Sequence, residues 1–378
     1  MATIGVVHFP AHGHVRPAIR LGRTIAAAGH RVVHWAPAEY RDDVERSGGE
    51  LRPMGELLGP GAENATSDDV IAGAAGGAVQ LTPRTVEELH AEGADLVVND
   101  VQAPWGRVAG EFLGLPTICS WPLFPPVGWL PRTQGPAPVH AQFLRDCWEI
   151  VGRRWGVELY SPHDALGSLG DVNIVYTTRE VAAAEAGPSW LFAGPLMDDG
   201  DHAAEPAVDG DDARPLVYVA LGTVYTSNAR LFRNVLEALA GEPVRVLVAT
   251  WGRLSADDLA PVPDNAVVTA RVDSRAVLRR AEVHVSHGGA GSAHESVLEG
   301  VPMLLVPQGS DQSLWTERLV DLGVGARAES ESPEAIRAGV LGLLEDESMR
   351  DRTGALGARL RAYDGAGVVA GAVEELLR

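Results

Sequence analysis

The chain of 378 residues consists of short apolar runs, rich in β-branched residues, that alternate with longer segments of helical periodicity. The runs predicted to be strands are 4–10, 31–37, 94–100, 116–120, 172–178, 216–223, 244–250, 266–272, 281–289 and 303–308. Strands that alternate with helices form βαβ units, which build parallel sheets with helices on both faces. The sequence therefore predicts an α/β protein with two Rossmann-like, doubly wound domains in tandem.

The two series of strands are separated by residues 197–214, an acidic stretch that contains Gly and Pro and few apolar residues. This composition is typical of a solvated interdomain linker. We therefore expect one domain over 1–196, a second over 215–356, and a C-terminal helical segment over 357–378.

Two Asp-x-Asp pairs lie in this linker, and such a pair could hold a metal for a nucleotide sugar: Asp199/Asp201 and Asp209/Asp211. No predicted strand leads into either pair to fix its carboxylates. We therefore interpret both pairs as solvated linker residues.

The first predicted helix follows the first strand. Ala18, Leu21 and Ile25 recur at helical spacing. Pro17 suits a first helical turn, and Gly29 suits the end of the helix.

The composition excludes several classes of protein. A net charge of −20 argues against nucleic acid as a partner, because phosphate binding requires a basic surface. The chain has no lysine, which excludes a P-loop lysine, a pyridoxal Schiff base and a lysine nucleophile. With only Cys119 and Cys147, no disulfide framework or zinc cluster is expected.

The N-terminus lacks a basic segment followed by an apolar one, so no signal peptide is predicted. No apolar run is long enough to span a bilayer. We therefore expect a cytoplasmic protein with no membrane partner.

Two histidines, His12 and His14, follow the first predicted strand, at the edge where open α/β sheets bind ligands. Such a pair can ligate zinc, one histidine can act as a general base, or both can be structural. The segment HGHVRP (12–17) offers no nearby carboxylate or third histidine to complete a zinc site. The choice between the other two roles depends on what the second domain carries.

The stretch SHGGAGS (286–292) overlaps the end of the strand predicted at 281–289 and leads into a helix expected to begin near Ser292. Its glycines permit close backbone approach, and the amides and helix dipole would face an anion. Glu295 lies three residues after Ser292, on the same helix face, where it could accept hydrogen bonds from ribose hydroxyls. A turn needed only for packing is the alternative, but the combination with His287 favours ligand binding.

Asp311 and Gln312 follow the strand predicted at 303–308 and begin another predicted helix. Adjacent acid and amide side chains are suited to binding vicinal hydroxyl groups. A helix cap is the alternative role for this pair.

The segment HGGAGSAHESVLEGVPMLLVPQGSDQ closely resembles the donor-site signature of family 1 glycosyltransferases of the GT-B fold. It is most similar to the actinobacterial enzymes that glycosylate macrolides and other antibiotics. The segment HGHVRPAIRLGRTIAAAGHRV resembles the N-terminal signature of that family, and ADLVVND resembles the segment with its second catalytic residue. The resemblance implies an acceptor-binding first domain, a nucleotide-sugar-binding second domain facing it across a cleft, and a C-terminal helix that packs on the first domain.

The resemblance also implies roles at matching positions. His14 would deprotonate the acceptor hydroxyl and Asp100 would hydrogen-bond its other nitrogen, which leaves a structural role for His12. Within the donor site, Glu295 would bind the ribose, and Asp311 and Gln312 the transferred sugar. The implied donor-binding residues are Thr223, Arg271, Val272, His287, Gly288, Gly289, Ala290, Gly291, Ser292, Glu295, Asp311 and Gln312.

Four positions depart from the family pattern. Arg271 stands where a tryptophan usually stacks on the donor base, and Asp273 and Ser274 replace the Pro-Gln that follows. A guanidinium plane can also stack on a base, so Arg271 is compatible with nucleotide binding. Trp315 replaces the usual asparagine after Asp311-Gln312 and puts the expected sugar contacts in question.

Aromatic residues that follow strands of the first domain are predicted to line an apolar acceptor pocket: Trp105, Trp121, Phe124 and Trp129. Phe112 is expected to pack in the core instead.

Together these features predict an inverting glycosyltransferase that needs neither a metal nor another cofactor. It would transfer a sugar from a TDP- or UDP-linked donor to a small lipophilic aglycone. A catalytically silent homologue that binds another enzyme is one alternative. A nicotinamide-dependent oxidoreductase is another, although the first strand lacks a G-x-G-x-x-G fingerprint. The sequence leaves open whether the chain acts as a monomer or a homodimer.

Overall fold

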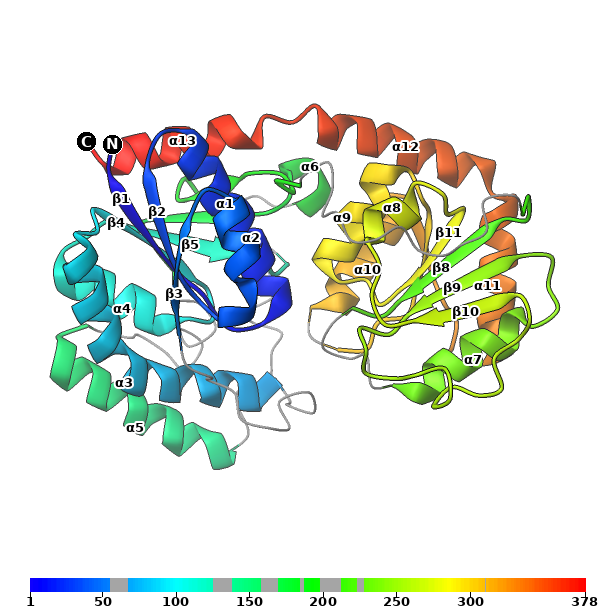
Figure 1. Cartoon of the computed structure of the whole chain (residues 1–378), viewed down its shortest axis with the longest axis horizontal. Helices are drawn as coiled ribbons and strands as arrows, with labels where there is room; N and C mark the ends of the chain where they lie inside the picture. The colour runs from blue at the N-terminus through cyan, green and yellow to red at the C-terminus, as the bar shows by residue number, and fades with distance from the viewer. Residues whose placement is uncertain are drawn as a thin grey trace. The chain divides into compact units, whose positions relative to one another are not determined.

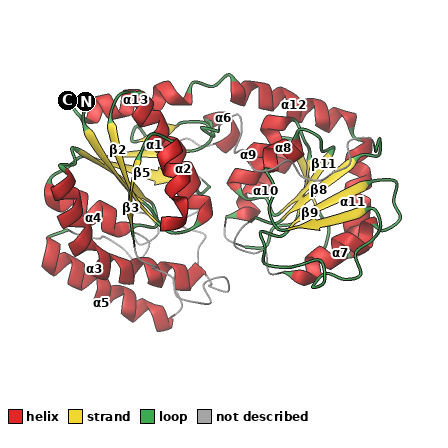
Figure 2. Ribbon diagram, in the orientation of Figure 1, coloured by secondary structure: helices red, strands yellow, loops and turns green. Residues whose placement is uncertain are grey.

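The structure is a computed structural model, and it describes residues 1–54, 67–124, 138–157, 169–183, 187–197, 212–222, 228–309 and 311–378. The chain divides into two compact units (Figure 1): Met1–Met197 with Asp364–Arg378, and Asp198–Tyr363. Helices flank a parallel sheet in each unit, as Figure 2 shows. Most of the predicted linker, with both Asp-x-Asp pairs, lies outside the described residues.

The described part of the first unit holds a parallel sheet in the order β3-β2-β1-β4-β5-β6-β7. Its strands are β1 (Thr3–Val7), β2 (Arg31–Ala36), β3 (Glu50–Pro53), β4 (Leu96–Asp100), β5 (Thr117–Trp121), β6 (Val172–Val175) and β7 (Trp190–Phe192). Val7 at the end of β1 pairs with Trp35 of β2 on one side and with Asn99 of β4 on the other. The carboxyl ends of β1 and β4 therefore lie side by side.

The described helices of the first unit are α1 (His12–Ala27), η1 (Ala38–Tyr40), α2 (Arg41–Arg46), α3 (Ser67–Glu92), α4 (Pro104–Leu113), α5 (Pro138–Trp155), α6 (Arg179–Ala182) and α13 (Gly365–Leu376). The C-terminal helix α13 belongs to this unit, because Val369 and Val373 share a buried cluster with Leu21 and Ile25 of α1. Its first residue, Gly365, lies so close to the Ala193 carbonyl that a Cβ would be 1.7 Å from that oxygen.

The described part of the second unit holds a parallel sheet in the order β10-β9-β8-β11-β12-β13. Its strands are β8 (Leu216–Ala220), β9 (Arg245–Ala249), β10 (Ala266–Thr269), β11 (Val283–Ser286), β12 (Met303–Leu305) and β13 (Gly325–Arg327). Its described helices are α7 (Ala229–Leu239), α8 (Ser274–Leu278), α9 (Ala290–Glu299), α10 (Gln312–Asp321), α11 (Pro333–Glu345) and α12 (Glu347–Arg361). Both sheets therefore have the doubly wound order that the alternation of strands and helices predicts.

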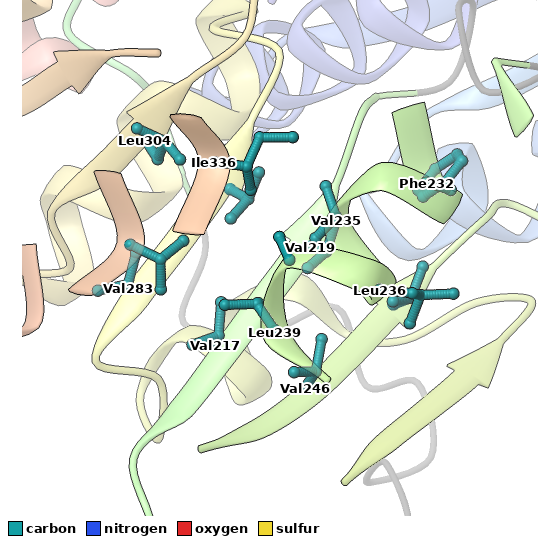
Figure 3. Close-up of a cluster of buried hydrophobic side chains, with 14 of the residues drawn as sticks. Val217, Val219, Phe232, Val235, Leu236, Leu239, Val246, Val283, Leu304 and Ile336 are labelled. Atoms are coloured by element: carbon teal, nitrogen blue, oxygen red, sulfur yellow. The ribbon is translucent and has the colours of Figure 1, made fainter. Parts of the chain in front are cut away.

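The core of the second unit follows from the alternation of side chains along β8. Val217 and Val219 join a cluster with Val235 and Leu239 of α7 on one face of the sheet (Figure 3). The intervening Tyr218 belongs to a different cluster, which includes Val277 and Leu278 of α8. A strand buried on both faces needs an uninterrupted apolar run, which explains the sequence LVYVA.

The predicted α/β class is confirmed, and each predicted strand corresponds to an observed one. Three short strands were not predicted, namely β3, β7 and β13. The expectation that Pro17 lies in a first helical turn is wrong, because α1 begins at His12 and includes Pro17 as its sixth residue. The earlier start puts His12 and His14 on the first turn of a helix instead of in a loop.

A buried pair of histidines joins the end of β1 to β2. The Nε2 of His8 lies 2.8 Å from the Nδ1 of His34, and the two rings stack with centroids 5.1 Å apart. A Cβ atom on Gly22 would lie 2.5 Å from the His34 ring, and a Cβ atom on Gly49 would lie 2.8 Å from it. The ring is therefore tightly enclosed. Burial lowers the pKa of His34 to about 3, and burial and His34 together lower the pKa of His8 well below its ordinary value.

We predict that acid destabilises this unit through His34. The unfolded chain takes up a proton near pH 6.5 whereas the folded protein does not, so stability falls as the pH drops from 6.5 towards the folded pKa of about 3. Between pH 8 and pH 5 one such histidine contributes a loss of about 2 kcal/mol. Urea denaturation at both pH values should show a smaller pH-dependent loss for His34→Gln than for the wild type. The exposed His90 of α3 provides the control His90→Gln, and equal losses for the two variants would contradict the assignment.

Candidate functional site

The site residues of the first unit lie at the carboxyl ends of β1 and β4. His14 is on the first turn of α1, and Asp100 is the last residue of β4. The Nδ1 of His14 lies 3.0 Å from both carboxylate oxygens of Asp100. Since a carboxylate only accepts hydrogen bonds, Nδ1 carries a proton in this contact, and Nε2 is the ring nitrogen left to act as a base.

The surroundings of Asp100 fix this contact. Its side chain is 1% exposed, whereas that of His14 is 12% exposed. The Oδ1 of Asp100 also accepts a hydrogen bond from the Gln102 amide at 2.8 Å. Phe9 packs edge-on against the His14 ring at 5.5 Å. The arrangement orients a partly accessible imidazole with a buried carboxylate, as a general base requires.

His12 has different partners. Its Nδ1 lies 3.2 Å from the hydroxyl of Tyr40, in η1. The two histidines of the HGH stretch therefore hydrogen-bond to different elements. In the described part of the chain, no group of three His, Cys, Asp or Glu side chains is arranged to hold a metal ion.

The glycine turn of the second unit surrounds His287. It connects β11 to α9, and its residue Gly289 is the N-cap of α9. A Cβ on Gly289 would lie 2.4 Å from the His287 Nε2, and a Cβ on Gly222, after β8, would lie 2.6 Å from it. Gly222 and Gly288 also have left-handed φ angles of 80° and 78°. Glycine is therefore required at these positions for the backbone to reach the ring.

His287 is uncharged in this setting. Its side chain is buried, and burial lowers its pKa to about 4. The Nδ1 has no hydrogen-bond partner in the described structure. The first turn of α9 has no side-chain cap, and the first-turn amides of a helix have no intrahelical acceptor. Because no side chain caps these amides, they are suited to donate hydrogen bonds to an anion.

Glu295 and Ser292 both lie on α9, three residues apart. Burial raises the pKa of the Tyr218 phenol, and the charges of Glu295 and Asp273 raise it further. The Tyr218 hydroxyl is 3.2 Å from the Ser274 hydroxyl. The charge of Glu295 therefore acts on Tyr218, whose hydroxyl contacts Ser274 at the start of α8.

Asp311 and Gln312 are both buried at the start of α10. The Oε1 of Gln312 accepts hydrogen bonds from the amides of Gln308 at 2.7 Å and Gly309 at 3.1 Å. Trp315, one of the departures from the family pattern, donates from Nε1 to Asp311 Oδ2 at 3.1 Å. The expected capping alternative does not hold for Asp311, whose side chain makes no cap hydrogen bond.

The other departures also have structural partners. The Arg271 guanidinium lies over the ring of Trp251 at 5.2 Å. Trp251 lies two residues after the end of β9 and has a left-handed φ of 55°, and the sequence did not mark it as a site residue. Asp273 is the N-cap of α8 and accepts a hydrogen bond from the Ala276 amide at 3.0 Å.

The aromatic residues predicted for the acceptor pocket differ in exposure. Trp105 and Trp121 are 1% and 0% exposed and belong to core clusters. Their side chains could influence an acceptor only through the residues that cover them. The Trp121 Nε1 donates to the Phe124 carbonyl at 3.0 Å, and Phe124 is partly buried. The expected core packing of Phe112 is wrong, because its ring is 49% exposed and lies edge-on against Trp155. Trp129 and Thr223 lie outside the described residues.

These features define a class. One doubly wound unit carries a histidine–carboxylate pair at the carboxyl ends of its strands, and a second carries a glycine turn at the equivalent edge. Two such units in one chain are the architecture of the GT-B fold.

Comparison with known proteins agrees with this class. Residues 234–376 match the family model of the erythromycin biosynthesis protein CIII-like C-terminal domain. The chain is 27% identical to demethyllactenocin mycarosyltransferase of Streptomyces fradiae, over 100% of this chain and 87% of that protein. It is 28% identical to oleandomycin glycosyltransferase of Streptomyces antibioticus, over 93% and 85% of the two chains.

Solved structures show the same relationship. The crystal structure of the kitacinnamycin glycotransferase is 26% identical and superimposes with a TM-score of 0.85, covering 100% of this chain and 99% of the other. The calicheamicin glycosyltransferase CalG4 shares the fold, at 24% identity and a TM-score of 0.78, covering 100% and 98%. The chain is therefore a glycosyltransferase of the GT-B fold, related to enzymes of antibiotic biosynthesis, and the predicted resemblance is confirmed. None of the described helices is long and apolar enough to cross a membrane.

Proposed function

We propose that this protein is an inverting glycosyltransferase that moves a sugar from a TDP- or UDP-linked donor to a hydroxyl of a small lipophilic natural product. The observation that carries the proposal is the His14–Asp100 pair, with Nδ1 held at 3.0 Å from the carboxylate and Nε2 oriented by it. A base of this kind, in a chain whose other unit has an anion-binding turn, suits the deprotonation of an acceptor hydroxyl.

In the proposed reaction, His14 Nε2 removes the proton of the acceptor hydroxyl as the acceptor oxygen attacks the anomeric carbon. The new carbon–oxygen bond forms while the bond from that carbon to the diphosphate oxygen breaks. Both electrons of the broken bond leave with the nucleoside diphosphate. Asp100 stabilises the imidazolium that forms, and one in-line displacement inverts the anomeric carbon.

The second unit would hold the donor. His287 and the amides of Gly288 to Ser292 would bind the diphosphate, with help from Thr223, and Glu295 would bind the ribose. Arg271 and Val272 would contact the base, and Asp311 and Gln312 the sugar hydroxyls. The burial of His287, Asp311 and Gln312 supports this assignment, because buried polar groups aligned in advance bind a polar ligand without reorganisation.

We propose that the reaction needs no metal. The first-turn amides and dipole of α9 supply positive potential where the diphosphate charge develops. Neither the base nor the donor residues named above require a cation for their roles.

The acceptor is proposed to be a lipophilic aglycone. Two similar proteins are named demethyllactenocin mycarosyltransferase and oleandomycin glycosyltransferase, and Phe124 follows β5 at the carboxyl edge that carries His14. Because Trp105 and Trp121 are buried in core clusters, this part of the proposal rests on Phe124 and on the contact predicted for Trp129 from the sequence.

We predict that His14→Ala lowers turnover about 100- to 10,000-fold, the usual contribution of a general base. Binding of UDP or TDP should stay within about twofold of the wild type, since the donor residues lie in the other unit. Steady-state kinetics with a panel of macrolide aglycones, together with calorimetry of nucleotide binding, measures both quantities.

The matched control is His12→Ala, which removes a neighbouring histidine whose hydrogen bond goes to Tyr40 instead. This variant should keep most of the wild-type turnover. If the two variants lose turnover equally, or if His14→Ala retains wild-type turnover, the assignment of the base is wrong. A wild-type protein that binds nucleotide but transfers no sugar would favour a catalytically silent homologue.

A second prediction concerns metals. Turnover should be unchanged in excess EDTA, because helix α9 carries the charge of the leaving group. Loss of activity in chelator, restored by Mg²⁺ or Mn²⁺, would contradict metal independence and direct attention to the Asp-x-Asp pairs of the linker. Heat-treated enzyme with the same chelator provides the background rate.

A further inference from the structure

Trp315 is the departure from the family pattern that makes direct contact with a predicted sugar-binding residue. It lies on α10, four residues after Asp311, and is 1% exposed. Its Nε1 donates a hydrogen bond to Asp311 Oδ2 at 3.1 Å, within the buried interior. An indole N–H is a donor only, so the carboxylate must turn an oxygen towards the helix.

The hydrogen bond from the indole is compatible with ligand binding by the same carboxylate. An ionised carboxylate has about four lone-pair positions, and the indole uses one of them. At 3.1 Å the contact has the length of an ordinary N–H···O hydrogen bond, and together with the buried indole it favours one orientation of the carboxylate. A sugar hydroxyl that donates to Asp311 then meets an acceptor whose direction is already fixed.

The indole ring also connects Asp311 to the glycine turn. His294 of α9 packs edge-on against Trp315, with ring centroids 5.4 Å apart and an interplanar angle of 80°. The Nδ1 of His294 lies 2.7 Å from the carbonyl oxygen of Ala290, the first residue of α9. Because a carbonyl only accepts, His294 donates from Nδ1 and is itself held in one orientation.

A second contact holds α10 against the same turn. A Cβ on Gly288 would lie 2.8 Å from Thr316 Oγ1 and 3.4 Å from the Gln312 carbonyl oxygen. Thr316 is fully buried, so α10 cannot retreat from the turn without exposing a packed face. The two helices that would bind the diphosphate and the sugar are therefore packed together directly around Trp315.

We propose that Trp315 is a positioning and specificity-determining residue of the donor site. Its N–H aligns the Asp311 carboxylate for one hydroxyl of the donor sugar, and its ring fixes the distance of that carboxylate from the diphosphate-binding turn. This inference rests on the proposed role of Asp311 in sugar binding. It assigns selectivity for a hydroxylated sugar to a residue that does not itself contact the sugar.

The test measures binding, so it does not depend on turnover. Calorimetry with the full-length protein compares UDP and UDP-glucose, TDP and TDP-glucose, and the four monodeoxy analogues of the better-bound donor at sugar carbons 2, 3, 4 and 6. In the wild type, removal of the hydroxyl that donates a hydrogen bond to Asp311 should weaken binding about 10- to 100-fold, as expected for a hydrogen bond to a charged group. The other three deoxy analogues should bind more nearly like the intact donor.

Trp315→Phe keeps an aromatic ring on His294 and removes the N–H. It should weaken binding of the intact donor about 5- to 20-fold, leave the free diphosphate within about twofold, and flatten the preference among the deoxy analogues. The non-natural residue β-(3-benzothienyl)alanine at position 315 replaces the N–H by sulfur at nearly the same volume. It should behave like Trp315→Phe and provides the test if the phenylalanine variant does not fold.

The matched control is Leu319→Ala, which removes a buried side chain one turn further along α10. It should lower thermal stability and keep the preference for the intact donor. If the position-315 variants retain the wild-type preference, or weaken the free diphosphate as much as the intact donor, this inference is overturned. A wild-type protein that binds no nucleotide sugar at all would overturn both this inference and the proposed function.

Discussion

The pairing of β1 with β4 in a parallel sheet is the contact on which the site of the first unit depends. Asp100 and His14 are 86 residues apart in sequence, and a register that sets Val7 against Asn99 brings their strand ends together. The helix that follows β1 begins at His12, so His14 projects from its first turn towards the end of β4. A shift of one residue in β4 would turn Asp100 to the other face of the sheet and remove the carboxylate from the imidazole.

The second unit uses packing of small residues for a similar purpose. Gly222 and Gly289 leave just enough room for the His287 ring, and Gly288 leaves room for Thr316. Glycine at these positions lets two loops and one helix approach closely, with the polar groups of the turn already in place. Such advance alignment is what electrostatic stabilisation of a leaving diphosphate requires. The same close packing positions Trp315 to donate its hydrogen bond to Asp311.

Much of this organisation could be predicted from the sequence. The apolar runs defined both sheets, and the motifs HGH, ADLVVND and HGGAGS marked the strand ends where His14, Asp100 and His287 lie. The short strand β13 was missed because three residues carry too little periodicity to be recognised. The start of α1 was misplaced because Pro17 usually marks a first turn, whereas this helix accommodates it as its sixth residue.

Side-chain contacts between distant segments were beyond the sequence. The residues around Trp315 do not reveal its hydrogen bond to Asp311, and those around Arg271 do not reveal that it lies over Trp251, because each contact depends on tertiary packing. For the same reason, aromatic residues near strand ends could not be divided into buried ones such as Trp105 and exposed ones such as Phe112. Hydrophobicity predicts that a side chain prefers burial but does not predict which neighbour covers it.

The central claim is that one base, His14 held by Asp100, drives a single displacement at the anomeric carbon. Proton NMR of the glycoside made from an α-linked UDP- or TDP-glucose tests it most directly, because the coupling between the protons on sugar carbons 1 and 2 reports the configuration. The account predicts a large coupling from a β-glycoside, the inverted product. A small coupling from an α-glycoside would contradict the single displacement and require a nucleophile of the enzyme beneath the sugar.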